Sequence, residues 1–326
     1  MTVLVSGAAG FLGTRLIEAL LAGPSGLPPI SRIIAADVSG CPVADPRVDS
    51  RIGTIVDPAF VRSIVDPDVR IVYHLAAVLS GQSEAEFDTG FQVNVDATRT
   101  ILEACRRLQT APRFVFSSTV AVFGGDLPAV VPENIALQPQ TSYGTEKAIV
   151  ELLVSEYSRR GFVDGVICRL ATITVRAGKP NSALSSFVSG IIREPLAGVD
   201  SICPVPLDTP IWVSSPAVVT QNLVHAACLR TPALEGRRAL NLPGLRVTPA
   251  ELLDSLERLG GAAARARVRC ELEERVARAM CQWPGALDDA RARRLGFIAD
   301  EDVDAIVRQY INETGRRVGE FEGRSP

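Results

Sequence analysis

Short apolar runs alternate with helical patterns along the first half of the chain. Strands are predicted at residues 2–7, 32–37, 69–77, 112–118 and 162–170, where aliphatic and β-branched residues follow one another. Residues 11–21 and 93–108 carry apolar positions at helical spacing. Each parallel return between strands needs a crossover, so this alternation predicts an α/β fold built on a doubly wound parallel sheet.

The alternation weakens after residue 170, which predicts a second, smaller domain. We expect the sheet domain to span residues 1–170 and to receive a returning segment at about 211–230. An α+β domain over residues 171–326 is expected to complete the chain. Within it, Thr248 and Pro249 begin a predicted helix that ends in a glycine stop.

Composition and charge narrow the classes of function. The 326 residues are 47% hydrophobic and 22% charged, with a net charge of −3 and no basic block, so nucleic-acid binding has little electrostatic support. No apolar stretch approaches the length of a membrane span, and the first strand runs into a glycine turn, unlike a signal peptide. Seven cysteines without a CxxC pair indicate reduced thiols and a cytoplasmic protein.

The two histidines, His74 and His225, lie inside apolar runs. Neither has a second metal ligand at useful spacing, so both are predicted to occupy core or helix positions. This pattern predicts neither a metal site nor a Ser-His-Asp triad.

A glycine-rich turn joins the first predicted strand to the first helix. Gly7, Gly10 and Gly13 in "GAAGFLG" allow the backbone to approach a pyrophosphate, while the helix N-terminus supplies free N–H groups. Asp37 ends the second strand, where a carboxylate accepts adenosine-ribose hydroxyls and repels a 2′-phosphate. Glycine and aspartate also serve plain turns. Together the two features predict NAD as the cofactor, in preference to NADP.

Tyr143 and Lys147 lie four residues apart in a helical pattern, which puts both side chains on one helix face. An ammonium group near a phenol lowers the pKa of the phenol, so this pair favours acid–base catalysis. The spacing alone is common on solvated helix faces. Here it follows Ser117, Ser118 and Thr119 at the end of a strand, and ligands of open α/β sheets bind at that edge.

Over essentially its full length the sequence resembles the extended short-chain dehydrogenase/reductase family. The matching motifs are "GAAGFLG", Asp37, "HLAA" at residues 74–77, Asn94 in "VNVDAT", "SSTVAVFG", and Tyr143 with Lys147. The resemblance implies a Rossmann fold with Tyr143 as the general base. Lys147 would lower the pKa of that tyrosine and bind the nicotinamide ribose. Thr119, or else Ser118, would orient the substrate.

The same resemblance implies the cofactor contacts and the assembly. NAD contacts are expected at Gly7, Gly10, Phe11, Leu12, Gly13, Asp37, Thr54, Ile55, Leu75, Ala76, Ala77, Asn94, Tyr143, Lys147, Leu170 and Thr172. Family members commonly pair their catalytic helices across a two-fold axis. A homodimer is therefore expected through the apolar side of the helix that contains Ile149, Leu152, Leu153 and Tyr157.

Residues 179–195, "KPNSALSSFVSGIIREP", contain no run long enough for a simple core helix. We expect residues 171–187, "ATITVRAGKPNSALSSF", to form a loop beside the nicotinamide. The loop resembles that of the D-erythronate dehydrogenases, a group within the family that oxidises the C2 hydroxyl of a four-carbon sugar acid with NAD. This implies oxidation of D-erythronate to 2-dehydro-D-erythronate, with the carboxylate held by basic and amide side chains. Substrate contacts are expected at Ser80, Thr119, Tyr143, Thr172, Arg176, Lys179 and Asn181.

Two other functions stay open. A nucleotide-sugar epimerase or dehydratase would use Tyr143 and Lys147 with tightly held NAD and recycle the cofactor. A non-catalytic protein that senses NAD would keep the fold, although such relatives tend to lose the tyrosine or the lysine that this chain retains.

Overall fold

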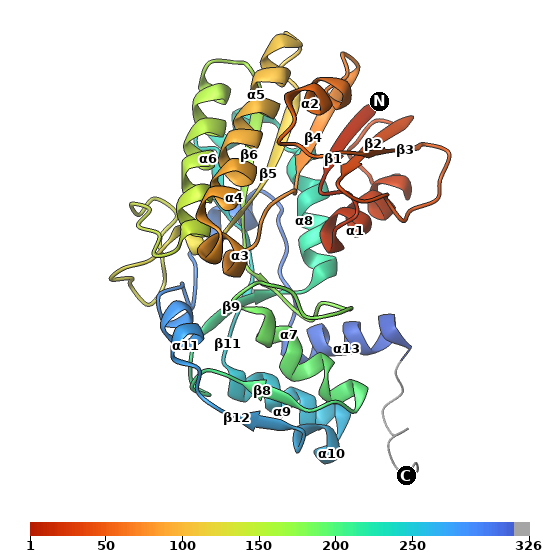
Figure 1. The fold of residues 1–326 in the computed structure, drawn as a ribbon. Coiled ribbons are helices and arrows are strands. Elements are labelled where there is room, and N and C mark those ends of the chain that lie inside the picture. Colours follow the sequence, from red (N-terminus) through yellow and green to blue (C-terminus); the bar gives the residue numbers. More distant parts are fainter. Residues whose placement is uncertain (316–326) are drawn as a thin grey trace.

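The computed structural model describes residues 1–315, and its central element is a seven-stranded parallel sheet (Figure 1). The strand order is β10-β6-β5-β4-β1-β2-β3, the reversal at β1 being typical of a doubly wound dinucleotide-binding sheet. The strands are β1 (Thr2–Ser6), β2 (Arg32–Asp37), β3 (Val48–Ile52), β4 (Val69–His74), β5 (Arg113–Thr119), β6 (Asp164–Leu170) and β10 (Ala239–Asn241). The predicted α/β fold and parallel sheet are confirmed.

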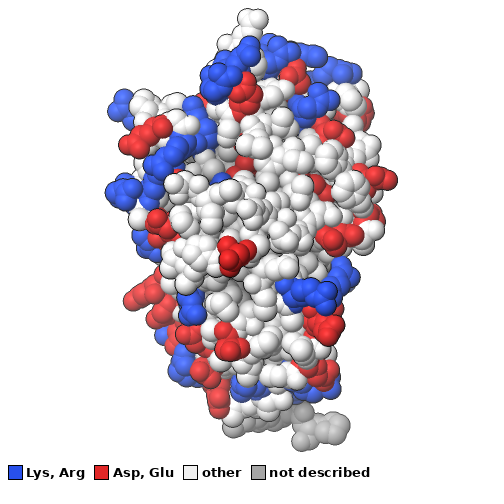
Figure 2. Space-filling view, turned by 90° about the vertical axis from the view of Figure 1, so that its left-hand side faces the viewer, with Lys and Arg blue, Asp and Glu red and all other residues white. Residues whose placement is uncertain are grey.

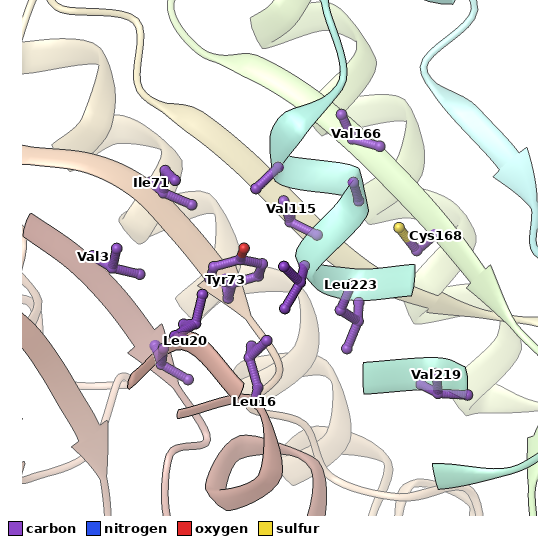
Figure 3. Close-up of a cluster of buried hydrophobic side chains, with 14 of the residues drawn as sticks. Val3, Leu16, Leu20, Ile71, Tyr73, Val115, Val166, Cys168, Val219 and Leu223 are labelled. Carbon is purple, nitrogen blue, oxygen red and sulfur yellow. The ribbon is translucent and has the colours of Figure 1, made fainter. Parts of the chain in front are cut away.

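Apolar side chains point alternately to the two faces of this sheet, so each face needs its own layer of helices. On one face, α1 (Phe11–Leu21) and α8 (Pro216–Cys228) cover a cluster that includes Tyr73, Val115 and Val219 (Figure 3). The helix predicted at residues 11–21 therefore forms within its predicted limits.

The other face is covered by α2 (Pro58–Ile64), α5 (Ala97–Arg107) and α6 (Ser142–Arg159). Phe114 and Phe116 of β5 point into this layer and are fully buried. The alternation along β5 explains how one strand serves both cores: Val115, between the two phenylalanines, faces α8 instead.

A buried ion pair joins the sheet to α6. The guanidinium of Arg169 in β6 lies 2.8 Å from the carboxylate of Glu151 in α6, and the two side chains are only 6% and 4% exposed. Ser118 of β5 donates to the same carboxylate, and Arg169 also donates to the amide oxygen of Asn241 in β10. Because an unpaired buried charge costs several kcal/mol, roughly 3–5 when one partner is removed, this network fixes β5, β6, β10 and α6 relative to one another.

Outside the main sheet the structure has two small sheets packed against helices, and we refer to this part of the chain as the second domain. One sheet contains β7 (Thr172–Ile173), β9 (Ile211–Ser214) and β11 (Leu245–Val247), and the other pairs β8 (Ser201–Cys203) with β12 (Val268–Cys270). The helices outside the two main layers are α3 (Ser80–Ala85), α4 (Phe87–Phe91), α7 (Ser186–Arg193), α9 (Pro249–Gly260), α10 (Ala262–Arg265), α11 (Glu274–Cys281), α12 (Ala290–Arg294) and α13 (Val303–Thr314). As predicted, a helix begins at Pro249; Thr248 and Glu251 form a reciprocal capping box there.

Two expectations differ from the structure. Residues 186–193 form α7, which buries Val188, Ile191 and Ile192 in the second-domain core, so the expectation that residues 179–195 contain no core helix was wrong. The helix begins just before the end of the loop predicted at 171–187. The apolar residues of α7 are interrupted by a serine and a glycine that are themselves buried. The helical spacing of its apolar positions is therefore not evident from the sequence. The chain also returns to the sheet for longer than residues 211–230, because β10 pairs with β6.

None of the helices within residues 1–315 combines the length and apolar character that crossing a bilayer requires.

Candidate active site

A cavity of about 680 Å³ follows the carboxyl ends of β1, β2, β4, β5 and β6, where parallel sheets bind their ligands. All seven predicted substrate positions line it, and so do all the predicted cofactor positions except Asn94. The structure therefore brings these predicted positions together around one cavity. The lining residues that it did not predict include Val38, Leu79, Val93, Ala177, Ser185 and Trp283.

The glycine turn allows a backbone approach that no other residue could make. Gly7 has a φ of +74°, and a Cβ placed on it would lie 2.7 Å from the backbone nitrogen of Ala76. A Cβ on Gly13 would lie 2.1 Å from the carbonyl oxygen of Gly7. The carboxylate of Asp37 accepts from the Ala9 N–H at 3.1 Å and reaches the same cavity. This open cradle at the N-terminus of α1 fits a dinucleotide cofactor.

Tyr143 and Lys147 project from the first two turns of α6. Thr141 caps this helix by accepting from the Gly144 N–H at 3.1 Å. Gly144 packs closely against the short turn at Val120–Val122 that follows β5. A Cβ on Gly144 would lie 2.2 Å from the Ala121 carbonyl oxygen. Tyr143 and Lys147 are thus placed against the sheet edge by backbone contacts that leave the helix little freedom.

The ammonium group of Lys147 is buried and donates to the carbonyl oxygen of Ser117 at 2.9 Å. It lies 5.6 Å from the centre of the Tyr143 ring. Burial lowers the pKa of Lys147 to about 8, although the carboxylates of Glu146 and Glu151 favour its charged form.

Burial raises the pKa of Tyr143 above its usual value, and the negative charge of Glu146 raises it further. The expectation that Lys147 lowers the pKa of this tyrosine is therefore not met in the protein alone. The ammonium group of Lys147 donates its hydrogen bond to the Ser117 carbonyl instead.

Thr119 and Ser118 have different surroundings. The Ser118 hydroxyl donates to the buried carboxylate of Glu151 at 2.5 Å. The Thr119 oxygen accepts from the Ala121 N–H at 3.1 Å, which leaves its proton available to a ligand. Both residues line the cavity, but the geometry favours Thr119 over Ser118 as the hydroxyl that orients a substrate.

Asn94 is the one predicted cofactor position outside the cavity lining. Its buried amide accepts from the Val78 N–H at 2.9 Å, donates to the Val78 carbonyl at 3.0 Å, and donates to Glu146 at 2.6 Å. It sits in a single π-helical turn, Gln92–Asp96, that precedes α5. Asn94 is a positioning residue: it fixes the loop after β4, whose next residues line the cavity.

The two histidines occupy structural positions, as predicted. His74 is 1% exposed and contacts the hydroxyls of Ser6 and Thr98, and burial lowers its pKa to about 3. His225 lies in α8, with its Nε2 atom 2.7 Å from the Leu295 carbonyl oxygen.

The loop that carries the predicted substrate contacts is bound to the first domain by backbone. The Gly81 N–H donates to the Ser182 carbonyl at 2.9 Å, and the Leu184 N–H donates to the Ser80 hydroxyl at 3.1 Å. A Cβ on Gly81 would lie 2.1 Å from that same Ser182 oxygen. A glycine is therefore required for the loop to close over the cavity.

Arg176 brings an uncompensated positive charge to this end of the cavity. Burial, followed by the nearby charge of Arg193, lowers its pKa. Arg193 is paired with Glu194 at 2.5 Å, but no acidic side chain within residues 1–315 forms an ion pair with Arg176. A half-buried cation without an acidic partner is suited to an anionic ligand.

We compared the sequence and the structure with those of known proteins. Residues 3–207 match the NAD dependent epimerase/dehydratase family. The chain is 49% identical to the D-erythronate dehydrogenase of Cupriavidus necator, over 97% of this chain and 99% of that one. It is 40% identical to the D-erythronate dehydrogenase of Haemophilus influenzae, over 95% and 99%. A crystal structure described as a nucleoside-diphosphate-sugar epimerase from Agrobacterium tumefaciens superposes with a TM-score of 0.92 at 38% identity, covering 98% of this chain and 96% of that one.

We expect Gly81→Ala to displace the loop at residues 179–185, because its new methyl group would overlap the Ser182 carbonyl. Hydrogen exchange measured by mass spectrometry should show faster exchange of the Leu184 amide. Gly40→Ala is the matched control, since a Cβ there would meet only Ile52 at an ordinary 3.7 Å. Equal protection of the loop in both variants would contradict this interpretation.

The contribution of Lys147 to the free energy of unfolding should increase as pH rises. The pKa of this lysine is about 8 in the folded protein and 10.5 in the reference state, so between these values the unfolded chain holds a proton that the folded chain has released. The unfolding free energy of the unaltered protein, minus that of Lys147→Met, should therefore increase across this pH range. Urea unfolding at both ends of the range measures it.

Lys179→Met, at an exposed lysine, provides the control for general pH effects on unfolding. A difference between the unaltered protein and Lys147→Met that stays constant with pH would show that Lys147 is not titrating in this range.

Proposed function

The chain belongs to the NAD dependent epimerase/dehydratase family, and we propose that it oxidises the C2 hydroxyl of D-erythronate to give 2-dehydro-D-erythronate. One observation carries the proposal: the same cavity holds Tyr143 and Lys147 at one point and the unpaired cation of Arg176 nearby. The first two suit removal of a proton during hydride transfer. The third suits a free carboxylate, which a sugar acid has.

NAD, rather than NADP, is the cofactor that we assign to this family member. The Asp37 carboxylate lines the cavity at the end of β2, where it can accept the ribose hydroxyls and would repel a 2′-phosphate. The turn from Gly7 to Gly13 would hold the pyrophosphate, and Lys147 the second ribose. When bound, the oxidised nicotinamide supplies the acceptor for the hydride.

The protein's own residues would manage the proton and the oxygen of C2. Thr119 donates its free hydroxyl proton to that oxygen and so orients it. Tyr143, as phenolate, takes the hydroxyl proton as C2 loses its hydride. Because burial raises the pKa of Tyr143, the adjacent ammonium group of Lys147 is required to stabilise the phenolate.

The substrate carboxylate would lie against the loop that follows β7. Arg176 offers a planar guanidinium that can bind a carboxylate through two parallel hydrogen bonds. Lys179 and Asn181, which line the same cavity, add donors. The loop itself is held in place through Gly81 and Ser182, so these donors are arranged before a substrate binds.

We also propose a cytoplasmic location, supported by the finding that all seven cysteines are free thiols.

A homodimer is the assembly that the surface supports. The face on which α4 and α6 lie carries a broad area with few charged side chains (Figure 2). On these helices Leu152 is 70% and Phe87 59% exposed. Exposed apolar side chains that lie within a broad area of few charges are typical of an interaction surface, whereas single ones are not.

We therefore expect the protein to sediment with twice the mass of one chain and Leu152→Glu to sediment as a monomer. Val199→Glu, at another apolar residue that is 54% exposed, should leave the mass unchanged. A monomeric unaltered protein would refute the dimer.

The proposed reaction is tested by incubating the protein with NAD and each of D-erythronate, L-erythronate, D-threonate and L-threonate, and following NADH absorbance. We expect NADH from D-erythronate and a loss of about 100-fold or more in kcat for Tyr143→Phe, because the phenol oxygen is the proton acceptor.

Arg176→Met should raise KM for the acid by about 10-fold or more while KM for NAD changes little.

Absence of NADH with every acid, together with NAD retained through purification, would favour an epimerase or dehydratase that recycles its cofactor. The likeness to the structure described as a nucleoside-diphosphate-sugar epimerase makes this the second candidate. A protein that binds NAD, turns over neither class of substrate and is unaffected by Tyr143→Phe would be an NAD sensor.

A further inference from the structure

One aromatic side chain from the second domain forms part of the cavity wall. Trp283 lies in the turn after α11, and within residues 1–315 it is the one lining residue that comes from beyond Ser185. The loop at residues 176–185 lines the same cavity. Trp283 therefore adds to the cavity a residue from late in the chain, a connection for which the turn "WPG" gives no local signal.

The segment before Trp283 is fixed by packing. Helix α11 buries Val276 and Met280 in the core of the second domain, against which the indole itself packs. The backbone N–H of Trp283 donates to the Met280 carbonyl at 3.2 Å, so the backbone continues its helical path into the turn. The ring is thus held before any ligand arrives, and little side-chain freedom would be lost on binding.

The segment after Trp283 is fixed just as firmly. A Cβ on Gly285 would lie 2.5 Å from Pro210, so this turn is in direct contact with the start of β9. The Val131 N–H donates to the Ala286 carbonyl, and the Asp288 N–H donates to the Val131 carbonyl, both at 2.9 Å. Contacts with both domains therefore hold the turn that carries Trp283 in place.

The chemistry of this wall contrasts with the polar groups beside it. Arg176, Lys179 and Asn181 offer donors, whereas an indole presents an apolar ring with a single N–H. A hydroxyl group pressed against such a ring loses its water without gaining a hydrogen-bond partner. The donors would attract the acid end of a substrate, and the ring would exclude further hydroxylated carbons.

We propose that Trp283 determines which chain length of sugar acid the enzyme accepts. With the carboxylate held by Arg176, a four-carbon acid fits between the loop and the ring. A five- or six-carbon acid would have to place additional CHOH groups where the indole lies. This inference rests on the proposed function for the class of substrate, and it adds the residue that limits its length.

The test compares kcat/KM for D-erythronate with that for five- and six-carbon aldonates at saturating NAD. In Trp283→Ala we expect the six-carbon to four-carbon ratio to rise by about 10-fold or more, because removing the ring opens space at the end of the substrate. Trp283→Phe, which keeps a flat apolar ring, should change the ratio much less. KM for NAD should stay the same in both variants.

Trp212→Phe is the matched control. The chain has two tryptophans, and Trp212 is 7% exposed with its indole N–H donating to the Leu242 carbonyl, away from the cavity. Its replacement should leave the ratio unaltered. Thermal unfolding of each variant, with Trp283→Leu as a second substitution, separates misfolding from altered specificity. An equal fall in kcat/KM for all acids in Trp283→Ala would overturn the proposal.

A failure of the proposed function would look different. The unaltered protein would then release NADH from no acid, and binding would decide the inference instead. Tryptophan emission is recorded with NAD present while D-erythronate or a six-carbon aldonate is added. A change that occurs with the four-carbon acid only, and disappears in Trp283→Phe, supports the length limit. No change with either acid, or the same change with both, overturns it.

Discussion

The site depends on one helix that buries three charged side chains, because each of them has to be neutralised or hydrogen-bonded where it lies. Glu146 of α6 bonds the amide of Asn94, which in turn fixes the loop after β4. Lys147 bonds the carbonyl at the end of β5, and Glu151 pairs with Arg169 of β6. The partners of a single helix thus bring three strand ends to one edge, where the cavity forms.

The parts of this arrangement that could be predicted from the sequence are local patterns. The turn from Gly7 to Gly13 is followed at once by the helix that it serves, and Tyr143 and Lys147 share a helix face because of their spacing alone. Asp37 ends a strand whose apolar run is obvious. In each case the residues that act together are near one another in the chain. Their spacing therefore determines how their side chains lie relative to one another.

The parts that could not be predicted depend on contacts between distant residues. Asn94 belongs to a recognisable motif, yet its amide bonds the loop after β4 and Glu146 rather than facing the cavity. The proton affinity of Tyr143 follows from desolvation, which spacing does not reveal. Trp283 reaches the cavity only through the packing of α11 and the contacts of the turn that follows it.

The place of β10 in the sheet has a consequence for how the protein is made. Its three residues, Ala239–Asn241, complete the parallel sheet beside β6 and accept a hydrogen bond from Arg169. A nascent chain on the ribosome therefore exposes the edge of β6 while about 70 further residues are synthesised, and domains generally fold as units in the order of their synthesis. Until then this edge is open to pairing with another chain. The part of the second domain from β7 to β9 is consequently synthesised before the sheet of the first domain can be completed.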